Sequence, residues 1–272
     1  MADREAPVGV FDSGVGGLSV LREIRKQLPH EHLIFVADQA HVPYGPRSLA
    51  EVRSFSEAIT RYLLDQGAKL IVVACNAASA ASLQSLRATF PDVPFVGMEP
   101  AVKPAAETTQ SGVVGVLATP ATFQGALYAS VVERFANGVR LLPNPCIGLV
   151  EQIEAGQLNG GQVHVILENA LMPMLAEGID TVVLGCTHYP FVIPQIEKIV
   201  GPQVRVIDPA PAIARQVGRL LTEHDLANGT HATGTVQFKT SGDAAALSRQ
   251  IAQLWAEDHP TDKVCWQENK LG

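Results

Sequence analysis

Residues 67–76 read GAKLIVVACN, and residues 178–187 read GIDTVVLGCT. In both stretches a glycine suited to ending a helix is followed by an apolar run, and a cysteine comes eight residues after the glycine. An uninterrupted apolar run of this length is typical of a strand buried on both faces of a parallel sheet. Each stretch therefore places one cysteine at the carboxyl end of a buried strand, and the agreement predicts an internal repeat.

A second pair of stretches supports the repeat. Residues 8–13 (VGVFDS) and 114–119 (VGVLAT) both read as strands that end on a hydroxyl residue just before a helix. Around these pairs, short apolar runs alternate with longer amphipathic segments, a pattern typical of an α/β fold whose parallel sheets are flanked by helices. We expect strands at 8–11, 32–36, 69–74, 93–96, 113–117, 139–141, 181–184, 204–207 and 236–239. We expect helices at 18–28, 48–66, 77–89, 122–135, 161–176, 191–200, 212–221 and 243–255, and a loop at 223–234.

Length and composition limit the class of protein. The 272 residues, 47% of them hydrophobic, suffice for one large domain or two small ones with their own cores. Lys and Arg number 20 against 27 Asp and Glu, so the net charge of −7 argues against nucleic acid and anionic lipid as partners. No apolar run reaches the roughly 18 residues of a membrane span, and the N-terminus has no signal-peptide core. We expect a soluble, cytoplasmic protein without a membrane segment.

The chain has four cysteines, which lie far apart and form no CxxC pair: Cys75, Cys146, Cys186 and Cys265. This spacing suits neither a disulfide framework nor a structural zinc site, so we expect no bound metal. Cys146 follows two prolines in a predicted loop, and Cys265 lies near the tail, so both are interpreted as small packing residues.

The other two cysteines have a setting that suggests chemistry. Ligands of open α/β sheets collect at the carboxyl ends of strands, so two facing lobes would bring Cys75 and Cys186 to opposite sides of one cleft. A helix N-terminus lowers a thiol pKa, and its amides, with the side chains of Asn76 and Thr187, would bind an anion. The neighbouring His188 could orient or protonate a thiol. A nucleophilic hydrolase with a Cys-His pair is an alternative, but it leaves the matching cysteine without a role.

Two turns at the same edge of the predicted sheet could reach a ligand. Residues 14–17 (GVGG) lack the spacing of a dinucleotide fingerprint, so we interpret them as a turn that lets a small ligand approach the backbone. Asp12 and Ser13 would point polar groups at that ligand, although Asp12 could instead cap the next helix. Residues 43–47 (PYGPR) form a tight turn that is either structural or presents the Tyr44 hydroxyl or the Gly45 amide.

Together these segments resemble the glutamate racemases, within the wider aspartate/glutamate racemase superfamily. The matching motifs are FDSGVGGLSV at 11–20, PYG at 43–45, VACN at 73–76 and LGCTHYP at 184–190. They follow the family's order from residue 8 to about 210, and their combination is highly specific. Weaker matches follow at 208–209 and 240–243.

The resemblance implies cofactor-independent interconversion of L- and D-glutamate, which supplies D-glutamate for peptidoglycan. It makes Cys75 and Cys186 the two proton-transfer residues, one on each face of the substrate, assisted by Asp12 and His188. A further acidic residue falls eight positions after Cys146, which selects Glu154 rather than Glu151, although the residues after Cys146 depart from the family's usual motif. The implied substrate-binding residues are Asp12, Ser13, Tyr44, Gly45, Asn76, Ala77, Thr119, Thr122, Thr187 and His188. Glutamate is then the expected small-molecule substrate, no nucleic acid or membrane is expected as a partner, and the oligomeric state, a homodimer included, is left open.

The resemblance also implies how the chain divides. The first α/β lobe would contain residues 1–97 plus 208–272 and carry Cys75, and the second would contain residues 98–207 and carry Cys186. One departure concerns the substrate, because Ala77 stands where the family usually has threonine. A lost hydrogen bond to a charged group is worth about 1.5–3 kcal/mol, so we expect weaker binding or altered specificity.

Two other functions remain open at this point. The first is a racemase for aspartate or another α-substituted acid, which is favoured by Ala77 in place of the family's usual threonine. A two-lobed binding protein without catalysis would close on a ligand in the same way. Both cysteines, with Asp12 and His188 beside them, argue against the loss of catalysis.

Overall fold

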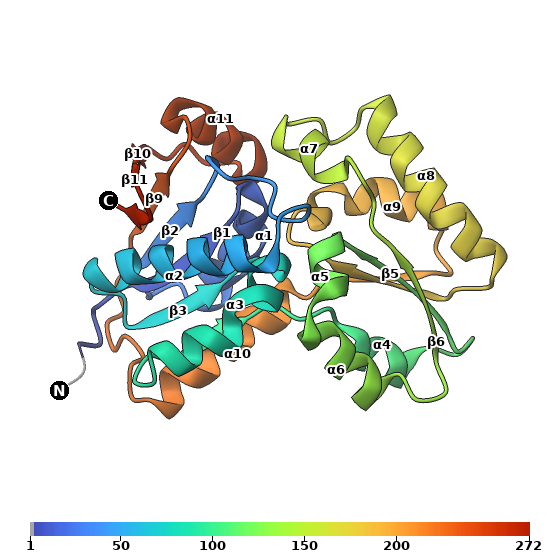
Figure 1. Ribbon diagram of the computed structural model, residues 1–272, viewed down its shortest axis with the longest axis horizontal. Coiled ribbons are helices and arrows are strands. Elements are labelled where there is room, and N and C mark those ends of the chain that lie inside the picture. The colour runs from blue at the N-terminus through green and yellow to red at the C-terminus, as the bar shows by residue number, and fades with distance from the viewer. Residues whose placement is uncertain (1–2) are drawn as a thin grey trace.

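The chain folds around two separate parallel sheets, as Figure 1 shows. The computed structural model describes residues 3–272. The larger sheet has six strands in the order β10-β9-β2-β1-β3-β4, and all neighbouring strands are parallel. These strands are β1 (Val8–Asp12), β2 (Leu33–Ala37), β3 (Leu70–Val73), β4 (Phe95–Gly97), β9 (Val236–Thr240) and β10 (Thr261–Lys263). We call this sheet and the helices on it the first lobe.

The smaller sheet has four parallel strands in the order β6-β5-β7-β8. They are β5 (Val113–Ala118), β6 (Arg140–Asn144), β7 (Thr181–Gly185) and β8 (Arg205–Ile207). This sheet and its helices form the second lobe. A short antiparallel hairpin of β11 (Trp266–Gln267) and β12 (Lys270–Leu271) lies near the C-terminus.

The strand orders of the two lobes are equivalent. In the first lobe β2-β1-β3-β4 follow one another, and β6-β5-β7-β8 take the same positions in the second. The two stretches that match in sequence end on β3 and β7, which occupy the same place in their sheets. The predicted α/β fold of two pseudo-symmetric lobes is therefore confirmed.

Helices cover both faces of the first sheet. Side chains alternate along β1, so Val10 packs toward one face and Phe11 toward the other. The Phe11 face is covered by α2 (Leu49–Asp65) and α3 (Asn76–Thr89). The opposite face is covered by α1 (Leu18–Gln27), α10 (Ala210–Glu223) and α11 (Ala244–Trp255), and the short helix η1 (Val15–Gly17) leads into α1.

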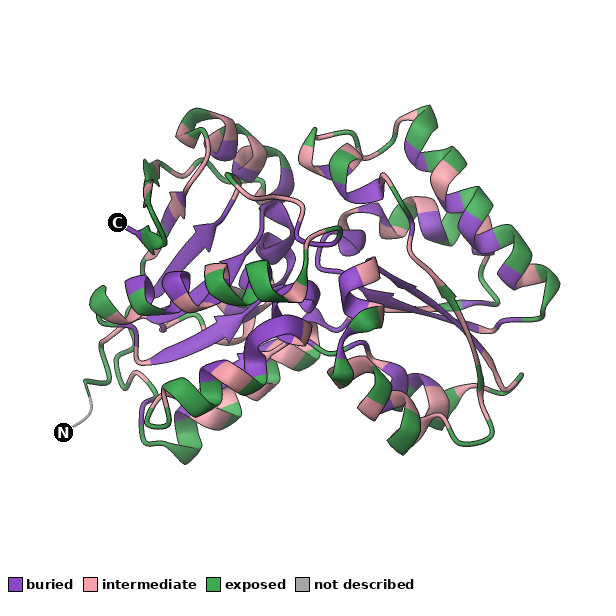
Figure 2. Ribbon diagram, in the orientation of Figure 1, coloured by how far each residue is buried: buried purple, intermediate pink, exposed green. Residues whose placement is uncertain are grey.

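The second sheet is covered in the same way. One face packs against α4 (Val102–Thr108), α5 (Pro120–Gln124) and α6 (Ala126–Phe135). The other packs against α7 (Leu149–Glu154), α8 (Gly161–Ala176), η2 (Tyr189–Val192) and α9 (Ile193–Val200). Strands β5 and β7 are almost wholly buried between these layers, and Figure 2 shows the central strands of both sheets as buried.

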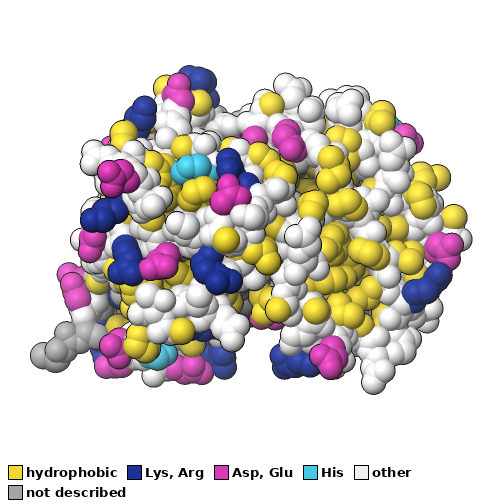
Figure 3. Space-filling view, viewed as in Figure 1, with side chains coloured by type: hydrophobic (Ala, Val, Ile, Leu, Met, Phe, Trp, Pro, Cys, Tyr) yellow, Lys and Arg dark blue, Asp and Glu magenta, His cyan; other side chains and the backbone are white. Residues whose placement is uncertain are grey.

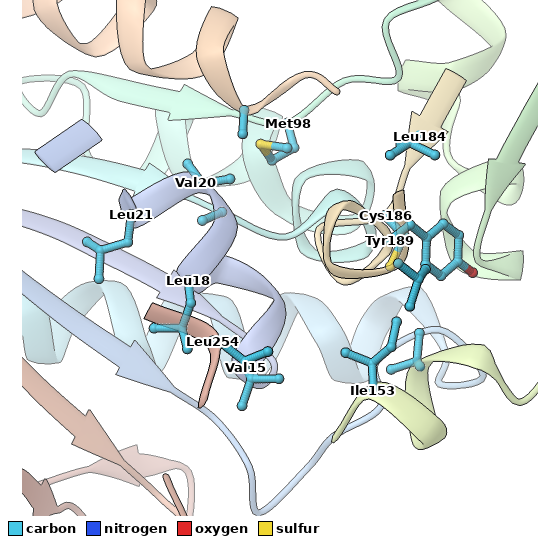
Figure 4. Packing of buried hydrophobic residues seen from close by; sticks show 14 of the residues in the cluster. Val15, Leu18, Val20, Leu21, Met98, Ile153, Leu184, Cys186, Tyr189 and Leu254 are labelled. Atoms are coloured by element: carbon cyan, nitrogen blue, oxygen red, sulfur yellow. The ribbon is translucent and has the colours of Figure 1, made fainter. Parts of the chain in front are cut away.

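The hydrophobic core runs from one lobe into the other. Val15 and Leu18 of the first lobe belong to the same buried cluster as Ile153 and Tyr189 of the second, and Figure 4 shows them around the junction. Cys186 lies in this cluster beside Tyr189. The lobes are thus joined by apolar packing directly beneath the strand ends.

The two lobes differ at the surface. In Figure 3 hydrophobic side chains gather over the right-hand, second lobe, whereas charged side chains are more frequent on the first. The large hydrophobic residues with the greatest exposure all belong to the second lobe: Ile147, Val165 and Met172. No helix within residues 3–272 combines the length and apolar character needed to cross a bilayer.

One predicted helix was wrong in its extent. The segment expected as a single helix over 122–135 is divided, because Gly125 has an extended backbone (φ −72°, ψ 138°) between α5 and α6. A Cβ at Gly125 would lie 2.5 Å from that of Ala80 on α3. The break therefore lets the chain of the second lobe pass close to a helix of the first.

Other elements were missed. The prediction contained no helix at α4 or α7 and no strands β10 to β12, all of which are seven residues or shorter. Such segments are too short to show a helical or alternating pattern. Cys265, expected as a packing residue, is exposed, whereas Cys146 is buried as expected. The lobe limits at residues 97 and 208 stay a prediction, although β9 and β10 do join the first sheet.

Candidate functional site

The carboxyl ends of strands from both sheets surround one small cavity. Its volume is about 20 Å³, little more than the space of a single water molecule. The first lobe supplies the residues that follow β1, β2 and β3, and the second supplies those that follow β5 and β7 together with one from α7. The lining residues are Ser13, Pro43, Tyr44, Gly45, Cys75, Asn76, Ala77, Thr119, Val150, Cys186, Thr187 and His188.

Cys75 occupies the N-cap of α3. The Ala78 amide donates a hydrogen bond to Cys75 Sγ at 3.5 Å, and the Ser13 hydroxyl lies 4.0 Å from the same sulfur. Burial nevertheless raises the pKa of this thiol, and the nearby carboxylate of Asp12 raises it further. The expectation of a lowered pKa was therefore wrong for Cys75, because desolvation outweighs the helix N-terminus. In this buried position the residue is a thiol at neutral pH.

Cys186 lies in a different electrostatic setting. Its Sγ is 3.7 Å from Nδ1 of His188, and Nε2 of His188 is 2.6 Å from Oε1 of Glu154. Burial alone lowers the pKa of His188, but its contacts with Cys186 and Glu154 raise it well above the usual value. Burial raises the pKa of Glu154, but hydrogen bonds from His188, Val15 and Gln39 bring it below normal. Cys186, His188 and Glu154 thus form a chain with an imidazolium next to the sulfur.

Asp12 lies behind the residues that line the cavity and accepts hydrogen bonds from residues of both lobes. Its carboxylate accepts hydrogen bonds from the Gly14 amide at 2.8 Å, the Ser13 hydroxyl at 3.1 Å and the Thr187 hydroxyl at 2.8 Å. Burial raises its pKa from 3.8 to about 6, although the charge of His188 lowers it. A carboxyl group with this pKa can accept or release a proton near neutral pH.

Asn76 presents an unsatisfied amide to the cavity. It is the first residue of α3 and is buried, yet neither its Nδ2 nor its Oδ1 has a hydrogen-bond partner among the described residues. Buried polar groups are nearly always paired, so an unpaired amide that lines a cavity is available to a ligand. The backbone amides of Asn76 and Ala77, at the N-terminus of α3, likewise have no acceptor among the described contacts. The arrangement suits a carboxylate.

The glycine turn after β1 makes room for protein side chains. A Cβ at Gly14 would lie 1.9 Å from Oε1 of Glu154, and one at Gly16 would lie 2.4 Å from Nδ1 of His188. The turn was interpreted as a place for a small ligand to approach the backbone. That interpretation was wrong for Gly14 and Gly16, because side chains of the second lobe fill the space beside them. The same side chains leave no room for a dinucleotide at this turn.

The turn after β2 contacts both the cavity and the second lobe. The hydroxyl of Tyr44 donates to Asp38 Oδ2 at 2.6 Å, so of the two groups considered only the Gly45 amide is unengaged among the described contacts. The carbonyl of Gly45 accepts from the Ala121 amide at 3.2 Å. Thr119 lines the cavity on that side, whereas Thr122 lies behind it with the two hydroxyl oxygens 3.3 Å apart.

The predicted residues thus fall into two sets. Those that line the cavity are Ser13, Tyr44, Gly45, Cys75, Asn76, Ala77, Thr119, Cys186, Thr187 and His188. Asp12, Thr122 and Glu154 stand behind these residues. The sequence reasoning missed Pro43 and Val150 in the lining, and it missed Gln39 and Asp38, which hold Glu154 and Tyr44. The PYG motif could have indicated Pro43, but Val150 has no signal beyond its place in a short helix.

Residues 3–272 contain no group of three or more His, Cys, Asp or Glu side chains arranged to hold a metal ion. Cys146 lines a neighbouring pocket of about 90 Å³ that shares Pro43, Gly45, Thr119 and Val150 with the cavity. Burial raises the pKa of Cys146 to about 12, so it is a thiol at neutral pH.

Comparison with known proteins shows which family this chain matches. A family model described as Asp/Glu/Hydantoin racemase matches residues 8–217. A glutamate racemase from Stutzerimonas stutzeri (strain A1501) is 50% identical over 259 residues, which cover 95% of this chain and 97% of that protein. The crystal structure of a glutamate racemase isoform from Bacillus anthracis has a TM-score of 0.89 at 30% identity and covers 98% of this chain and 99% of that one. The Escherichia coli glutamate racemase, solved in complex with L-glutamate and the activator UDP-MurNAc-Ala, has a TM-score of 0.82 at 35% identity, with 95% and 97% covered.

Proposed function

Since this chain belongs to the Asp/Glu/Hydantoin racemase family and is an isomerase, we propose that its substrate is glutamate, which it interconverts between the L and D forms. The curated relative at 50% identity is a glutamate racemase, and the Escherichia coli relative binds L-glutamate. Both cover nearly the whole of this chain. We further propose that the D-glutamate serves peptidoglycan synthesis in the cytoplasm, as the resemblance to the family implies.

The proposed mechanism rests on one observation: two thiols from equivalent strand ends of two repeated lobes line the same small cavity. A racemase must remove the α-proton from one face of the substrate and return a proton to the other. Cys75 and Cys186 are the groups that supply such a pair. One thiolate takes the α-proton and leaves its electron pair on the substrate, and the opposite thiol then donates its proton to Cα.

The neighbours of each sulfur fit this exchange. His188, held by Glu154, can stabilise the thiolate of Cys186 and exchange a proton with its sulfur. Ser13 and Asp12 lie on the Cys75 side, where Asp12 with its pKa of about 6 can accept a proton near neutral pH. The roles of the two cysteines exchange when the reaction runs in reverse.

Substrate binding would use the groups that lack partners. We assign the substrate carboxylate to the side-chain amide of Asn76 and the backbone amides of Asn76 and Ala77, with the Gly45 amide as a further donor. Fixed donors of this kind also stabilise the negative charge that develops when the α-proton leaves. Ala77 contributes only its backbone amide here, because it has no hydroxyl.

The test is proton NMR of L-glutamate with the purified protein in D₂O, without added cofactor. We expect loss of the α-proton signal together with decay of the circular dichroism of the amino acid. Cys75→Ser and Cys186→Ser should each abolish racemisation, and full turnover by either variant would refute the two-thiol mechanism. Turnover of L-aspartate should be measured at the same concentration, because Ala77 replaces the family's usual threonine. Faster turnover of aspartate would make aspartate the substrate. Ligand-dependent thermal stabilisation without any proton exchange would instead indicate a binding protein.

A further inference from the structure

A buried carboxylate next to the site has no role in the proposed reaction. Asp38 follows β2 and is fully buried. Its oxygens accept hydrogen bonds from the Tyr44 hydroxyl at 2.6 Å, the Ser241 hydroxyl at 2.6 Å and the Trp266 indole nitrogen at 2.8 Å, and Nδ1 of His41 lies 2.9 Å away. A buried carboxylate is costly unless several donors surround it, and here four do.

The donors come from two distant parts of the chain. His41 and Tyr44 belong to the turn after β2, whereas Ser241 follows β9 and Trp266 begins β11. Aromatic contacts strengthen the same junction, since the indole of Trp266 packs edge-on against His41 at 5.0 Å between ring centroids. His41 in turn stacks on Phe55 of α2 at 4.0 Å. The C-terminal segment therefore holds the turn against the first lobe.

The turn carries this constraint to the cavity. Tyr44 and Gly45 both line it, and a Cβ at Gly45 would lie 2.9 Å from that of Thr119 in the second lobe. Because burial and Asp38 raise the pKa of Tyr44 well above normal, its hydroxyl stays protonated and remains a donor to Asp38. The hydrogen bond thus fixes both the ring of Tyr44 and the backbone that follows it.

We propose that Asp38 is a positioning residue for substrate binding, which holds the turn 43–45 against the cavity through Tyr44 and is itself completed by Trp266 and Ser241. The inference rests on the proposed function, because the turn is assigned there to the substrate. Within residues 3–272 the Asp38 side chain makes no hydrogen bond to either Cys75 or Cys186. Its loss should therefore weaken binding more than proton transfer.

The first experiment combines kinetics with a measurement that needs no substrate. For Asp38→Asn, which keeps the shape of the side chain, we expect the KM for glutamate to rise about tenfold, equivalent to about 1.4 kcal/mol, with a much smaller change in kcat. Tyr44→Phe should raise KM by a similar factor, and the double variant should be no worse than either single one, because both remove the same link. Hydrogen–deuterium exchange of residues 39–47 in the free protein should become faster in Asp38→Asn.

The second experiment tests the link from the C-terminal segment and has a matched control. Trp266→Phe keeps an aromatic ring but removes the N–H donor, so KM should rise about threefold. Trp255→Phe makes the same chemical change at a tryptophan that packs on Phe238 and whose N–H is not among the donors to Asp38, and it should leave KM unchanged. These variants test the proposal even if Asp38→Asn fails to fold.

Several results would overturn the proposal. A wild-type KM with unchanged hydrogen exchange in Asp38→Asn would remove the link to the turn. A fall in kcat with unaltered KM would place Asp38 in proton transfer instead. If the unsubstituted protein fails to racemise glutamate, the proposed function is refuted, and the exchange of residues 39–47 still decides whether Asp38 positions the turn.

Discussion

At the scale of single residues, the two sulfurs have unequal neighbours although their strands are equivalent. Cys186 has His188 and Glu154 in line with it, whereas Cys75 has Ser13 and, further back, Asp12. The repeat therefore includes the strands and the two cysteines that follow them, but it does not include the groups that assist the cysteines. Two predictions follow from individual side chains.

Glu154→Gln should reduce kcat by about 10²-fold, the lower range of general acid–base effects. The carboxylate of Glu154 raises the pKa of His188, so a neutral amide lets that pKa fall and the imidazolium is lost at a lower pH. The alkaline limb of the pH–kcat profile should accordingly move to lower pH. Glu151→Gln, on an exposed position of the same helix, is the control and should keep the wild-type profile. An unshifted limb in Glu154→Gln would contradict the coupling.

Asp12→Asn should make the folded protein more stable at pH 8 while it impairs racemisation. Burial raises the pKa of Asp12 from 3.8 to about 6, so between these values the folded chain holds a proton that the unfolded chain has released. Stability is then lost as the pH rises through this window, by an amount on the order of 3 kcal/mol. Melting temperatures from pH 4 to 8 should fall less in the variant than in the wild type. Parallel curves for the two proteins would show that this carboxyl does not titrate in the window.

At the scale of elements, α11 of the first lobe holds the end of α7 in the second. Gln250 donates to the carbonyl of Glu154 at 2.6 Å, and Gln253 donates to that of Gly156 at 3.0 Å. Gln250 also accepts from Gln39 at 2.9 Å, and Gln39 lies 3.4 Å from the Glu154 carboxylate. Two glutamines one turn apart thus satisfy carbonyls that the end of α7 leaves free.

Gln250→Ala should lower kcat about fivefold, because Glu154 loses the contact that fixes its backbone, and one such hydrogen bond is worth about 1 kcal/mol. Steady-state kinetics of the variant provide the measurement. Gln237→Ala, an exposed glutamine on β9, offers a matched control. Equal kcat for the two variants would show that α7 is held without α11.

The glycine turn of η1 permits a sharp test of the close contact between the lobes. In Gly16→Ala the new Cβ would overlap His188 Nδ1, so His188 must move away from Cys186. We expect racemisation to fall by at least about 10²-fold while the protein still folds. Gly161→Ala, at the start of α8 with no atom within 4 Å of the added Cβ, should have wild-type activity. High activity in Gly16→Ala would mean that His188 is not needed at its observed position.

The elements also show how far a sequence can predict such a site. The buried strands β1, β3, β5 and β7 were predictable because their apolar runs are continuous, and the residues that follow them in sequence were therefore located at one edge. The break at Gly125 was not predictable, since it depends on Ala80, which is distant in sequence. The same holds for Asp38 and Gln250, whose roles depend on contacts made over about 200 residues of chain. Local pattern indicates the strand ends, and only the packed structure brings their supporting residues together.

At the scale of the whole molecule, burial limits access to three of the four thiols. Cys75, Cys146 and Cys186 are buried, and Cys265 is exposed. A reagent such as dithionitrobenzoate should therefore react rapidly with one thiol and slowly with three, and Cys265→Ser should remove the rapid phase. A cavity of about 20 Å³ is too small for glutamate, so residues that line it must move for the substrate or the reagent to enter. Bound glutamate should slow the reaction of Cys75 and Cys186 further, and rapid reaction of all four thiols would contradict the burial of three of them.

The unequal surroundings of the two sulfurs have a thermodynamic consequence for a racemase. Mirror-image substrates have the same free energy in water, so the equilibrium constant is unity whatever groups flank Cys75 and Cys186. By the Haldane relation, kcat/KM must then be identical in the two directions. The imidazolium on one side can make turnover faster for one enantiomer only if the KM for that enantiomer is higher in the same proportion. The asymmetry of the site therefore determines at which concentrations of each enantiomer the protein saturates, and it cannot make the reaction favour either one.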